Sequence, residues 1–565
     1  MKKISNIQVQ KDKIGKHITV YGWVDRVRNL GGMIFVDLRD RTGVLQLVID
    51  PALSGAKDIG LQDCIRAAGD VKERPEGQKK PEMDTGNIEL HVKKLDVLNK
   101  SKVPPFVVEN KVKASEELRL RHRYLDLRRA PMQQNIIFRH SVITAMREYL
   151  NSNGFVEIET PILTRSMPEG ARDYLVPSRL YARKFYALAQ SPQMYKQLLM
   201  VAGFERYYQI ARCMRDEDPR HDRQPEHTQI DIEMSFVDEN DVFEIAEGMF
   251  LHIFKAAMQQ ELKIPFPRMT YASAMETYGT DKPDMRFGME IVDLHDAFGG
   301  VEFPPFDGKE HIRGLVIERG NDVSRRRLDT MNDSAKATGL NGIFWAKIDD
   351  KCTGSIGKLI CKNIVGALGL QKGNLLIAAA GDEKIFRFLG QLRTELAAEL
   401  SLCESGFRFL WVTDFPIFEL DERTGKVVAS HHIFTQPQPD DVQYLDSDPL
   451  RVHGRLYDLV CNGNELASGS IRNHERRLQE KLFAIADMDP AKYTMLLDAL
   501  DYGAPPHGGI APGIDRIVMI LAGLTSLRDV IAFPKTTTAQ GLLEGIPDTV
   551  SSEQIKELHI KFDQQ

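Results

Sequence analysis

The stretch from Arg212 to Phe236, RCMRDEDPRHDRQPEHTQIDIEMSF, constrains the fold of this chain more than any other, because a charged loop leads directly into an alternating strand. One face of that strand is apolar, and the other carries Asp231 and Glu233 two residues apart. Two such carboxylates repel each other unless cations lie over them. The preceding loop offers four cations: Arg212, Arg215, Arg220 and Arg223. The pattern favours a hairpin whose arginines bind phosphate and whose carboxylates take an ammonium or Mg²⁺; a solvated sheet face is the simpler alternative.

The chain is too long for a single hydrophobic core. Its 565 residues predict about three to four domains, and 42% hydrophobic with 27% charged residues is an ordinary globular composition. No apolar run approaches the roughly twenty residues of a membrane span. The N-terminal MKKISNIQVQKDK has no apolar core and does not resemble a secretory signal. We therefore expect a soluble, cytoplasmic protein that does not enter a membrane.

The cysteines and the net charge exclude few classes of function, but the cysteines limit which cofactors we expect. The six cysteines are scattered without a CxxC pair, which argues against a disulfide framework and against zinc. The net charge of −6 gives no support for nucleic-acid binding by itself, although a local basic surface remains compatible with it.

Residues from about 15 to 100 read as five short strands separated by turns, which predicts a small barrel of the OB-fold type. In MIFVDLRD, Ile34, Val36 and Leu38 share one face, whereas Phe35 lies on the polar face with Asp37. An aromatic residue on that face is a candidate base-stacking platform. A surface phenylalanine covered by a loop is an equally good interpretation of the pattern.

The rest of the chain alternates helices and strands. Apolar residues from Phe138 to Tyr149 recur at helical spacing up to a stop at Gly154, and FVEIETPIL predicts a strand ended by Pro161. Residues from about 270 to 420 form a separate α+β unit with a long amphipathic helix, EKIFRFLGQLRTELAAEL.

Two motifs of the last third carry chemistry. GGIAPGIDR lacks both GxGxxG and GxxxxGK[ST], so it predicts only a close backbone approach at Gly513 with an arginine shortly after it. NELASGSIR places Glu465 and Arg472 seven residues apart, as a metal ligand with a substrate-binding guanidinium or as a structural ion pair.

Together these pieces resemble the class II aminoacyl-tRNA synthetases, and specifically their bacterial aspartyl type. FRHSVITAMREYLNSNGFVEIETPIL is similar to motif 1, FERYYQIARCMRDEDPRHDRQPEHTQIDIEMSF to motif 2, and GGIAPGIDRIVMILAG with RDVIAFPK to motif 3. PEGARDYLVPSR, QSPQMYKQLL, SHHIFTQP and NELASGSIR are similar to the features of the aspartate type. The resemblance covers essentially the whole chain.

The resemblance implies a multidomain α+β protein with an antiparallel-sheet catalytic domain. It implies an OB-fold anticodon-binding domain over residues 1–103, a linker over 104–135, and a catalytic domain over 136–270 that resumes at 421–565. An inserted α+β domain of the GAD type would occupy 271–420. Motif 1 would form the interface of a homodimer.

The resemblance also implies how ATP and Mg²⁺ are held. Arg215 would bind the α-phosphate and the substrate carboxylate, and Glu217 would read the adenine amino group. Asp458 and Glu465 would bind Mg²⁺. The remaining implied ATP-binding residues are Asp216, Arg223, Gln224, His227, Gly513, Ile514, Asp515 and Arg516.

For the amino acid, the resemblance implies an aspartate pocket. Arg472 and Lys196 would clamp the side-chain carboxylate, and Glu169, Ser191, Gln193, Arg215, Asp231 and His431 would complete the pocket. The implied reaction is formation of aspartyl-adenylate from L-aspartate and ATP, followed by transfer to the terminal adenosine of tRNA(Asp). Arg215, Arg516 and Glu217 would be its catalytic residues.

One position departs from the family. Its members usually carry Phe in the QPEFTQ segment to stack on adenine, and this chain has His227. Imidazole offers less stacking area, and its charge depends on pH.

In the barrel, Arg28, Phe35 and Gln46 match the anticodon-reading residues, and Glu89 matches them less closely. Two alternatives stay open. An enzyme that also charges tRNA(Asn) is one, because Leu30 resembles the aspartate-only form whereas Gly77 resembles the relaxed form. A non-catalytic, synthetase-derived nucleic-acid-binding protein is the other, and it predicts damage to the ATP residues.

Overall fold

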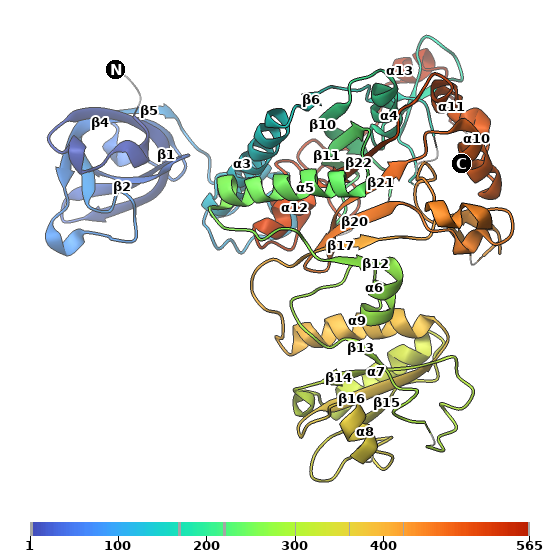
Figure 1. Cartoon of the computed structure of the whole chain (residues 1–565). Coiled ribbons are helices and arrows are strands. Elements are labelled where there is room, and N and C mark those ends of the chain that lie inside the picture. Colours follow the sequence, from blue (N-terminus) through green and yellow to red (C-terminus); the bar gives the residue numbers. More distant parts are fainter. Residues whose placement is uncertain are drawn as a thin grey trace. The chain divides into compact units, whose positions relative to one another are not determined.

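The computed structural model describes residues 4–167, 171–217, 222–299, 301–360, 362–421 and 423–562 (Figure 1). The chain divides into two compact units. One comprises residues 1–137 with 528–548, and the other comprises 138–527 with 549–565.

The first unit contains the predicted barrel. Strands β1 (His17–Leu30), β2 (Met33–Asp40), β3 (Gly43–Ile49), β4 (Cys64–Glu73) and β5 (Ile88–Asn99) close in the order β1-β2-β3-β5-β4. Ile34, Val36 and Leu38 are buried in its core, as their alternation predicts. The OB-fold prediction is confirmed.

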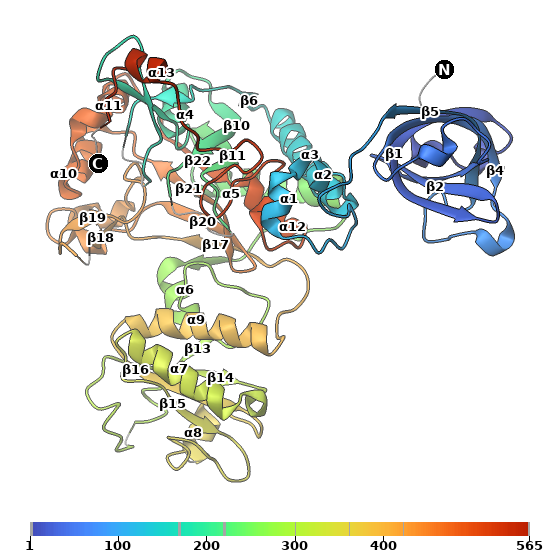
Figure 2. The same cartoon turned by 180° about the vertical axis from the view of Figure 1, so that it is seen from behind.

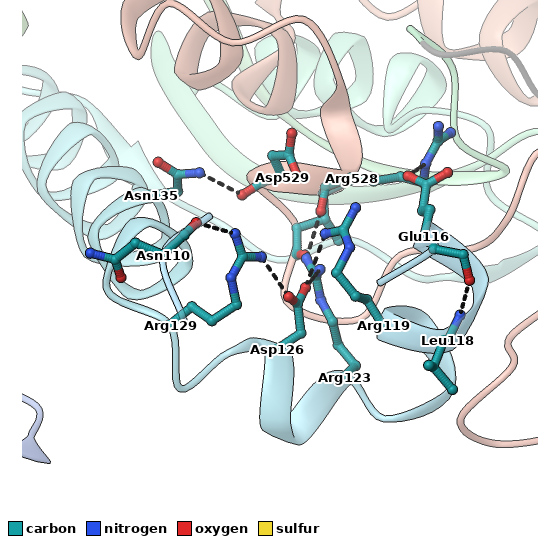
Figure 3. A network of polar contacts seen from close by, with 12 residues as sticks. Asn110, Glu116, Leu118, Arg119, Arg123, Asp126, Arg129, Asn135, Arg528 and Asp529 are labelled. Carbon is teal, nitrogen blue, oxygen red and sulfur yellow. Dashed lines mark hydrogen bonds and ion pairs between the residues drawn. The ribbon is translucent and has the colours of Figure 1, made fainter. Parts of the chain in front are cut away.

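The basic stretch behind the barrel folds into a buried connector. It contains α1 (Glu116–Arg121) and α2 (Arg123–Asp126), followed by the start of α3 (Ala130–Ser152). Asp126 is fully buried and pairs with Arg123 at 2.7 Å and Arg129 at 2.6 Å, and Arg123 donates to the carbonyls of residues 528, 531 and 532 (Figure 3). These bonds attach the 528–548 segment to the first unit.

The second unit is built on an eight-stranded sheet in the order β12-β17-β20-β21-β22-β11-β10-β6. Its strands are β6 (Val156–Glu157), β10 (Arg206–Met214), β11 (Glu226–Ser235), β12 (Arg268–Thr270), β17 (Phe409–Thr413), β20 (Leu456–Cys461), β21 (Asn464–Arg472) and β22 (His507–Pro512). All pairs are antiparallel except β6 with β10 and β12 with β17, at the two edges. The predicted antiparallel catalytic sheet is confirmed.

Helices and two small sheets surround this sheet. The helix α5 (Glu239–Ile253) lies against it and stacks Phe243 on Trp411, with the ring centroids 4.2 Å apart (Figure 1). The other helices are α4 (Gln193–Val201), α10 (Arg476–Ile485), α11 (Thr494–Leu500), α12 (Ile514–Leu521) and α13 (Ser552–Glu557). The small sheets are β7 (Leu163–Thr164), β8 (Leu175–Pro177) and β9 (Phe185–Leu188), and the pair β18 (Phe418–Leu420) and β19 (Val427–Ala429).

The predicted strand FVEIETPIL differs from the structure. Only Val156–Glu157 form β6, which pairs with Tyr207 and Tyr208 of β10 at the edge of the large sheet. Leu163–Thr164 form β7 in a separate sheet. Pro161 lies between them and cannot donate to a ladder, so the run cannot continue as one strand. The predicted helix before it is α3, which begins at Ala130 rather than Phe138 and ends just before Gly154, a residue with φ of 78°.

The predicted α+β unit forms a four-stranded sheet in the order β13-β14-β16-β15. Its strands are β13 (Ile291–Asp293), β14 (His311–Ile317), β15 (Phe344–Lys347) and β16 (Leu375–Gly381). The helices α7 (Arg325–Ala337) and α9 (Lys384–Glu399) pack on one face, and α8 (Lys362–Ala367) packs on the other (Figure 2). The helix α6 (Tyr271–Tyr278) precedes them. Among all described helices, none is long and apolar enough to cross a membrane.

Candidate functional site

A cavity of about 820 Å³ in the second unit collects most of the predicted site residues. Motif 2 contributes β11 and the end of β10, motif 3 contributes β22 and α12, and β21 and α4 complete the walls. The predicted residues that line the cavity are Ser191, Gln193, Lys196, Arg215, Glu217, Arg223, Gln224, His227, Asp231, His431, Glu465, Arg472, Gly513, Asp515 and Arg516.

Other predicted residues lie elsewhere. Asp458 is buried on β20, Ile514 is fully buried, and Asp216 donates its backbone N–H to the carbonyl of Arg172. None of these three lines the cavity. Glu169 and Arg220 lie outside the described residues.

The two carboxylates of the alternating strand are both paired with cations that line the cavity. Lys196 Nζ lies 2.9 Å from Asp231 Oδ1 and 3.4 Å from Glu233 Oε2. Arg472 Nε donates to Glu233 Oε1 at 2.9 Å, and its Nη2 donates to Oε2 at 3.1 Å. The cations over these carboxylates therefore come from α4 and β21, not from the motif 2 loop. Arg212 and Arg223 of that loop pair instead with Glu226 and Glu217.

Because this network is buried, each of its charges requires a partner of opposite charge. Burial alone would raise the pKa of Glu233, but Arg472 and Lys196 outweigh it and lower that pKa to about 2. All four residues are at most 1% exposed. A buried charge that loses its partner is costly, so each member orients the others.

Two residues of this network have no role among those that the family resemblance implies. Glu233 was expected only as a carboxylate for an ammonium or Mg²⁺, together with Asp231, whose strand face it shares. His432 Nε2 lies 3.3 Å from Arg472 Nη1, and burial followed by the charge of Arg472 lowers the pKa of His432 well below its usual value. The neutral ring can accept from Arg472. The HH pair in SHHIFTQP was the available signal, but it does not reveal which histidine is buried.

The close backbone approach of GGIAPGIDR lies at Gly509 and not at Gly513. A Cβ at Gly509 would overlap the carbonyl of Ile232 and the carboxylate of Glu233, whereas one at Gly513 would meet only the carbonyl of Leu466 at 3.8 Å. Gly509 thus lets β22 pass directly over the Glu233 carboxylate.

Arg215 and Arg516 also line the cavity. Arg215 Nε is buried without a hydrogen-bond partner in the part of the chain that the structure describes. Arg516 Nη1 donates to the carbonyl of Glu465 at 2.7 Å. Asp515 pairs with Arg139 of α3 and accepts from the backbone N–H of Thr228 at 2.8 Å. The unpaired Nε suits Arg215 to an anion, while Asp515 connects segments of all three motifs.

His227 lines the cavity together with these arginines, and its side chain is partly exposed. Burial, followed by the charge of Arg215, lowers the pKa of His227 to about 3. The imidazole is neutral at neutral pH. The pH-dependent charge that a histidine suggests therefore changes only well below neutral pH.

Asp458 of β20 and Glu465 of β21 form a carboxylate pair. Asp458 Oδ1 is buried and accepts no hydrogen bond from any described residue. Burial and the charge of Glu465 raise the pKa of Asp458 well above its usual value. Two convergent carboxylates, one with an unsatisfied oxygen, are suited to Mg²⁺ completed by phosphate oxygens. Among described residues, no group of three or more His, Cys, Asp or Glu could hold a metal by itself.

The four barrel residues predicted to read the anticodon share one outer face. Arg28 donates to Asp37 at 2.7 Å and reaches Gln46 at 3.5 Å, and Gln46 donates to Glu89 at 2.9 Å. Phe35 is half-buried and stands opposite Arg28 in the β1–β2 register. This ladder crosses β1, β2, β3 and β5. Asp37 and His91, which lies 2.8 Å from Glu89, were not predicted as members.

The two residues associated with tRNA discrimination lie at turns. Leu30, at the end of β1, is 62% exposed, and Gly77 is exposed within the short turn Glu76–Gln78.

Comparisons with known proteins agree with this geometry. Residues 115–537 match the family described as tRNA synthetases class II (D, K and N), and residues 18–98 match the OB-fold nucleic acid binding domain. A relative from Caldanaerobacter subterraneus subsp. tengcongensis named Aspartate--tRNA(Asp/Asn) ligase is 47% identical over 97% of this chain and 96% of its own length. One from Shouchella clausii named Aspartate--tRNA ligase is 46% identical over 98% of both chains.

Solved structures share the fold at lower identity. The asparaginyl-tRNA synthetase of Pyrococcus horikoshii with asparaginyl-adenylate matches with a TM-score of 0.61 at 19% identity, over 95% of this chain and 98% of that one. The aspartyl-tRNA synthetase of Entamoeba histolytica matches with a TM-score of 0.59 at 20% identity, over 94% and 91%. Because the family match spans most of the sequence and the relatives align over nearly their full length, this chain belongs to the class II (D, K and N) tRNA synthetases.

Proposed function

We propose that this protein is an aspartate–tRNA ligase that works in the cytoplasm. The observation that carries the proposal is the buried Lys196–Asp231–Glu233–Arg472 network, of which Lys196, Asp231 and Arg472 line the same cavity as Arg215 and Arg516. Two cations backed by buried carboxylates suit an amino acid with a side-chain carboxylate, and the arginines suit the phosphates of ATP. The full-length relatives named as aspartate–tRNA ligases support the same substrate.

In the first step, the α-carboxylate oxygen of aspartate attacks the α-phosphorus of ATP. A new P–O bond forms aspartyl-adenylate, and the bond to the β-phosphate breaks to release pyrophosphate. Arg215 would hold the α-phosphate, and Arg223 and Arg516 the γ-phosphate. In the second step the 3′-terminal hydroxyl of tRNA(Asp) attacks the activated carbonyl and AMP leaves.

No side-chain nucleophile is required for either step. Alignment of the reactants and neutralisation of developing charge by Arg215 and Arg516 supply the rate enhancement. Asp458 and Glu465 would hold Mg²⁺, which neutralises phosphate charge when bound. Glu217 and Gln224 would contact the nucleotide.

The pocket also accounts for amino-acid choice. Lys196 and Arg472 would bind the aspartate side chain, with Glu169, Ser191, Gln193, Asp231 and His431 around the rest of the molecule. Asparagine would leave charged donors underpaired, at a cost of about 2–5 kcal/mol.

The direct test is ATP–pyrophosphate exchange with aspartate, asparagine and glutamate in parallel. Aspartate should support exchange, and the other two should support far less. Equal exchange with asparagine would refute the assigned pocket, and no exchange with any of the three would refute the enzyme.

An enzyme that also charges tRNA(Asn) is the second candidate. Gly77 favours it, and several relatives carry the name Aspartate--tRNA(Asp/Asn) ligase, whereas Leu30 favours the aspartate-only form. Charging of purified tRNA(Asp) and tRNA(Asn) separates the two, since only the relaxed enzyme produces aspartyl-tRNA(Asn). A non-catalytic descendant ranks far lower because Arg215, Glu217, Glu465, Arg472 and Arg516 are all present and line one cavity.

A further inference from the structure

Lys282 does not line the cavity, but it contacts Glu465 of the Asp458–Glu465 carboxylate pair. Lys282 follows α6 in the loop 279–290, and its Nζ lies 3.1 Å from Glu465 Oε2 and 3.3 Å from Asp281 Oδ2. Its side chain is 38% exposed, so it is held by charge and not by enclosure. No role for Lys282 follows from the motifs of the family.

The loop that carries Lys282 is firmly positioned. Arg393 of α9 is completely buried and donates to the backbone carbonyls of residues 284, 287, 288 and 289. Its guanidinium also lies 4.1 Å from the centroid of the Phe287 ring. One side of the loop is therefore attached to the four-stranded α+β unit.

The other side of the loop touches the hairpin that carries Asp458 and Glu465. A Cβ added at Gly463, in the turn between β20 and β21, would lie 3.3 Å from the Cβ of Asp284. Asp284 in turn holds Arg286 at 2.6 Å. The loop is thus held at Asp284 and from Phe287 to Met289, and Lys282 lies two residues before this held part.

The contact with Glu465 conflicts with the role proposed for that residue. Glu465 and Asp458 would hold a divalent cation, and an ammonium 3.1 Å from the same carboxylate repels any such ion. Because the Lys282 stem is flexible and partly solvated, its charge can leave Glu465 without moving the loop backbone. Asp458 meanwhile keeps an oxygen that no described residue satisfies.

We propose that Lys282 is the resident counter-ion of the Asp458–Glu465 pair in the ATP-free protein, and that it leaves Glu465 when a divalent cation enters. The inference rests on the proposed function only through the assignment of these two carboxylates to the metal. Lys282 is a positioning residue: it holds the Glu465 carboxylate in place between turnovers. This gives the inserted unit a role, because Arg393 positions the loop that delivers the lysine.

The test is a Mn²⁺ titration of the full-length, ATP-free protein, followed by electron paramagnetic resonance. Lys282→Met removes the competing charge and should bind Mn²⁺ about tenfold more tightly than the wild type. Lys282→Gln, a second neutral variant, should behave in the same way. Lys282→Arg retains the charge and should stay near the wild-type affinity.

Lys426→Met is the matched control. Lys426 Nζ pairs with Asp487 at 2.7 Å on a solvent-exposed surface, so its removal should leave Mn²⁺ affinity unchanged. Wild-type or weaker Mn²⁺ binding by both neutral Lys282 variants would overturn the inference. Aspartate-dependent exchange by the wild type is measured separately: exchange without the Mn²⁺ effect overturns the inference alone, whereas absence of exchange overturns the proposed function.

Discussion

At the residue scale, Glu233 holds together the two cations of the proposed aspartate clamp. It is fully buried and pairs with both Arg472 and Lys196, which reach it from β21 and α4. Neither cation can move without exposing a buried charge to an apolar environment. The proposed aspartate clamp is therefore already oriented before substrate arrives, which reduces the ordering cost of binding.

Arg472→Ala should reduce aspartate-dependent ATP–pyrophosphate exchange by about a hundredfold or more, because the substrate carboxylate loses its bidentate partner. The measurement is kcat/KM for aspartate in the exchange assay. Near-normal exchange in this variant would exclude Arg472 from the clamp.

Glu233→Gln changes the residue that supports Arg472 and Lys196 and leaves these two clamp residues in place. It should lower the free energy of unfolding by about 3 kcal/mol at neutral pH, since Arg472 loses a charged partner, while exchange persists at high aspartate. The folded-state pKa of Glu233 is about 2, below its usual 4.5. Its ionised form therefore stabilises the protein above about pH 4.5, and this contribution is lost as the pH falls toward 2. Urea unfolding should show the difference between wild type and variant shrinking over that interval.

His227→Phe should lower KM for ATP by about threefold, because phenyl offers more stacking area than imidazole. The low pKa of His227 leaves the ring neutral well above its value of about 3. The ratio of the two KM values should thus stay constant between about pH 6 and pH 9. A ratio that grows toward pH 6 would show that His227 gains charge in that range.

At the scale of single elements, β2 of the barrel presents Phe35 beside the Arg28–Gln46–Glu89 ladder. Phe35→Ala should raise KM for tRNA at least about fivefold through loss of base stacking, and leave aspartyl-adenylate formation intact. Aminoacylation and exchange assays measure the two steps. Tyr21→Ala is the control, since Tyr21 pairs with Arg66 of β4 rather than with the ladder strands. An equal effect of both variants on tRNA would argue against stacking by Phe35.

The connector of α1 and α2 depends on Asp126. Its carboxylate is fully buried among Arg119, Arg123 and Arg129 (Figure 3). Asp126→Asn should lower the free energy of unfolding by about 3–5 kcal/mol, because three cations lose their common partner. Glu117→Gln removes the exposed pair with Arg121 and should cost no more than about 0.5 kcal/mol. Denaturant unfolding of both variants checks the contrast.

At the scale of the whole molecule, the short strand β6 is an edge strand of the eight-stranded sheet. Val156 is 46% exposed, and in the part of the chain that the structure describes β6 pairs only with β10. An exposed edge of this kind is suited to pairing with a second chain. We expect sedimentation equilibrium to give about twice the chain mass of 64.0 kDa, as a motif 1 homodimer requires. Val156→Lys should shift the protein toward the monomer, whereas a wild-type monomer at micromolar concentration would contradict the proposed interface.

The barrel and the alternating strand could be predicted because their signals are local. The parity of Ile34, Val36 and Leu38 alone predicts which face is buried, and the same rule puts Asp231 and Glu233 on one face of β11. The motifs likewise identified half of the residues that line the cavity through their resemblance to a known family. Local patterns are enough wherever a residue's neighbours along the chain are also its neighbours in space.

Tertiary structure alone determined which cations pair with the carboxylates of the site. Arg472 lies 239 positions from Glu233 along the chain, and Lys282 approaches Glu465 on a loop attached to a different sheet. The arginines nearest in sequence pair with other acids instead. Residue identity determined that Asp231 and Glu233 needed cations, because two adjacent buried charges cannot stand unpaired. Which cations they receive depends on strand order and close approach at Gly509, and these are set by packing across the whole sheet.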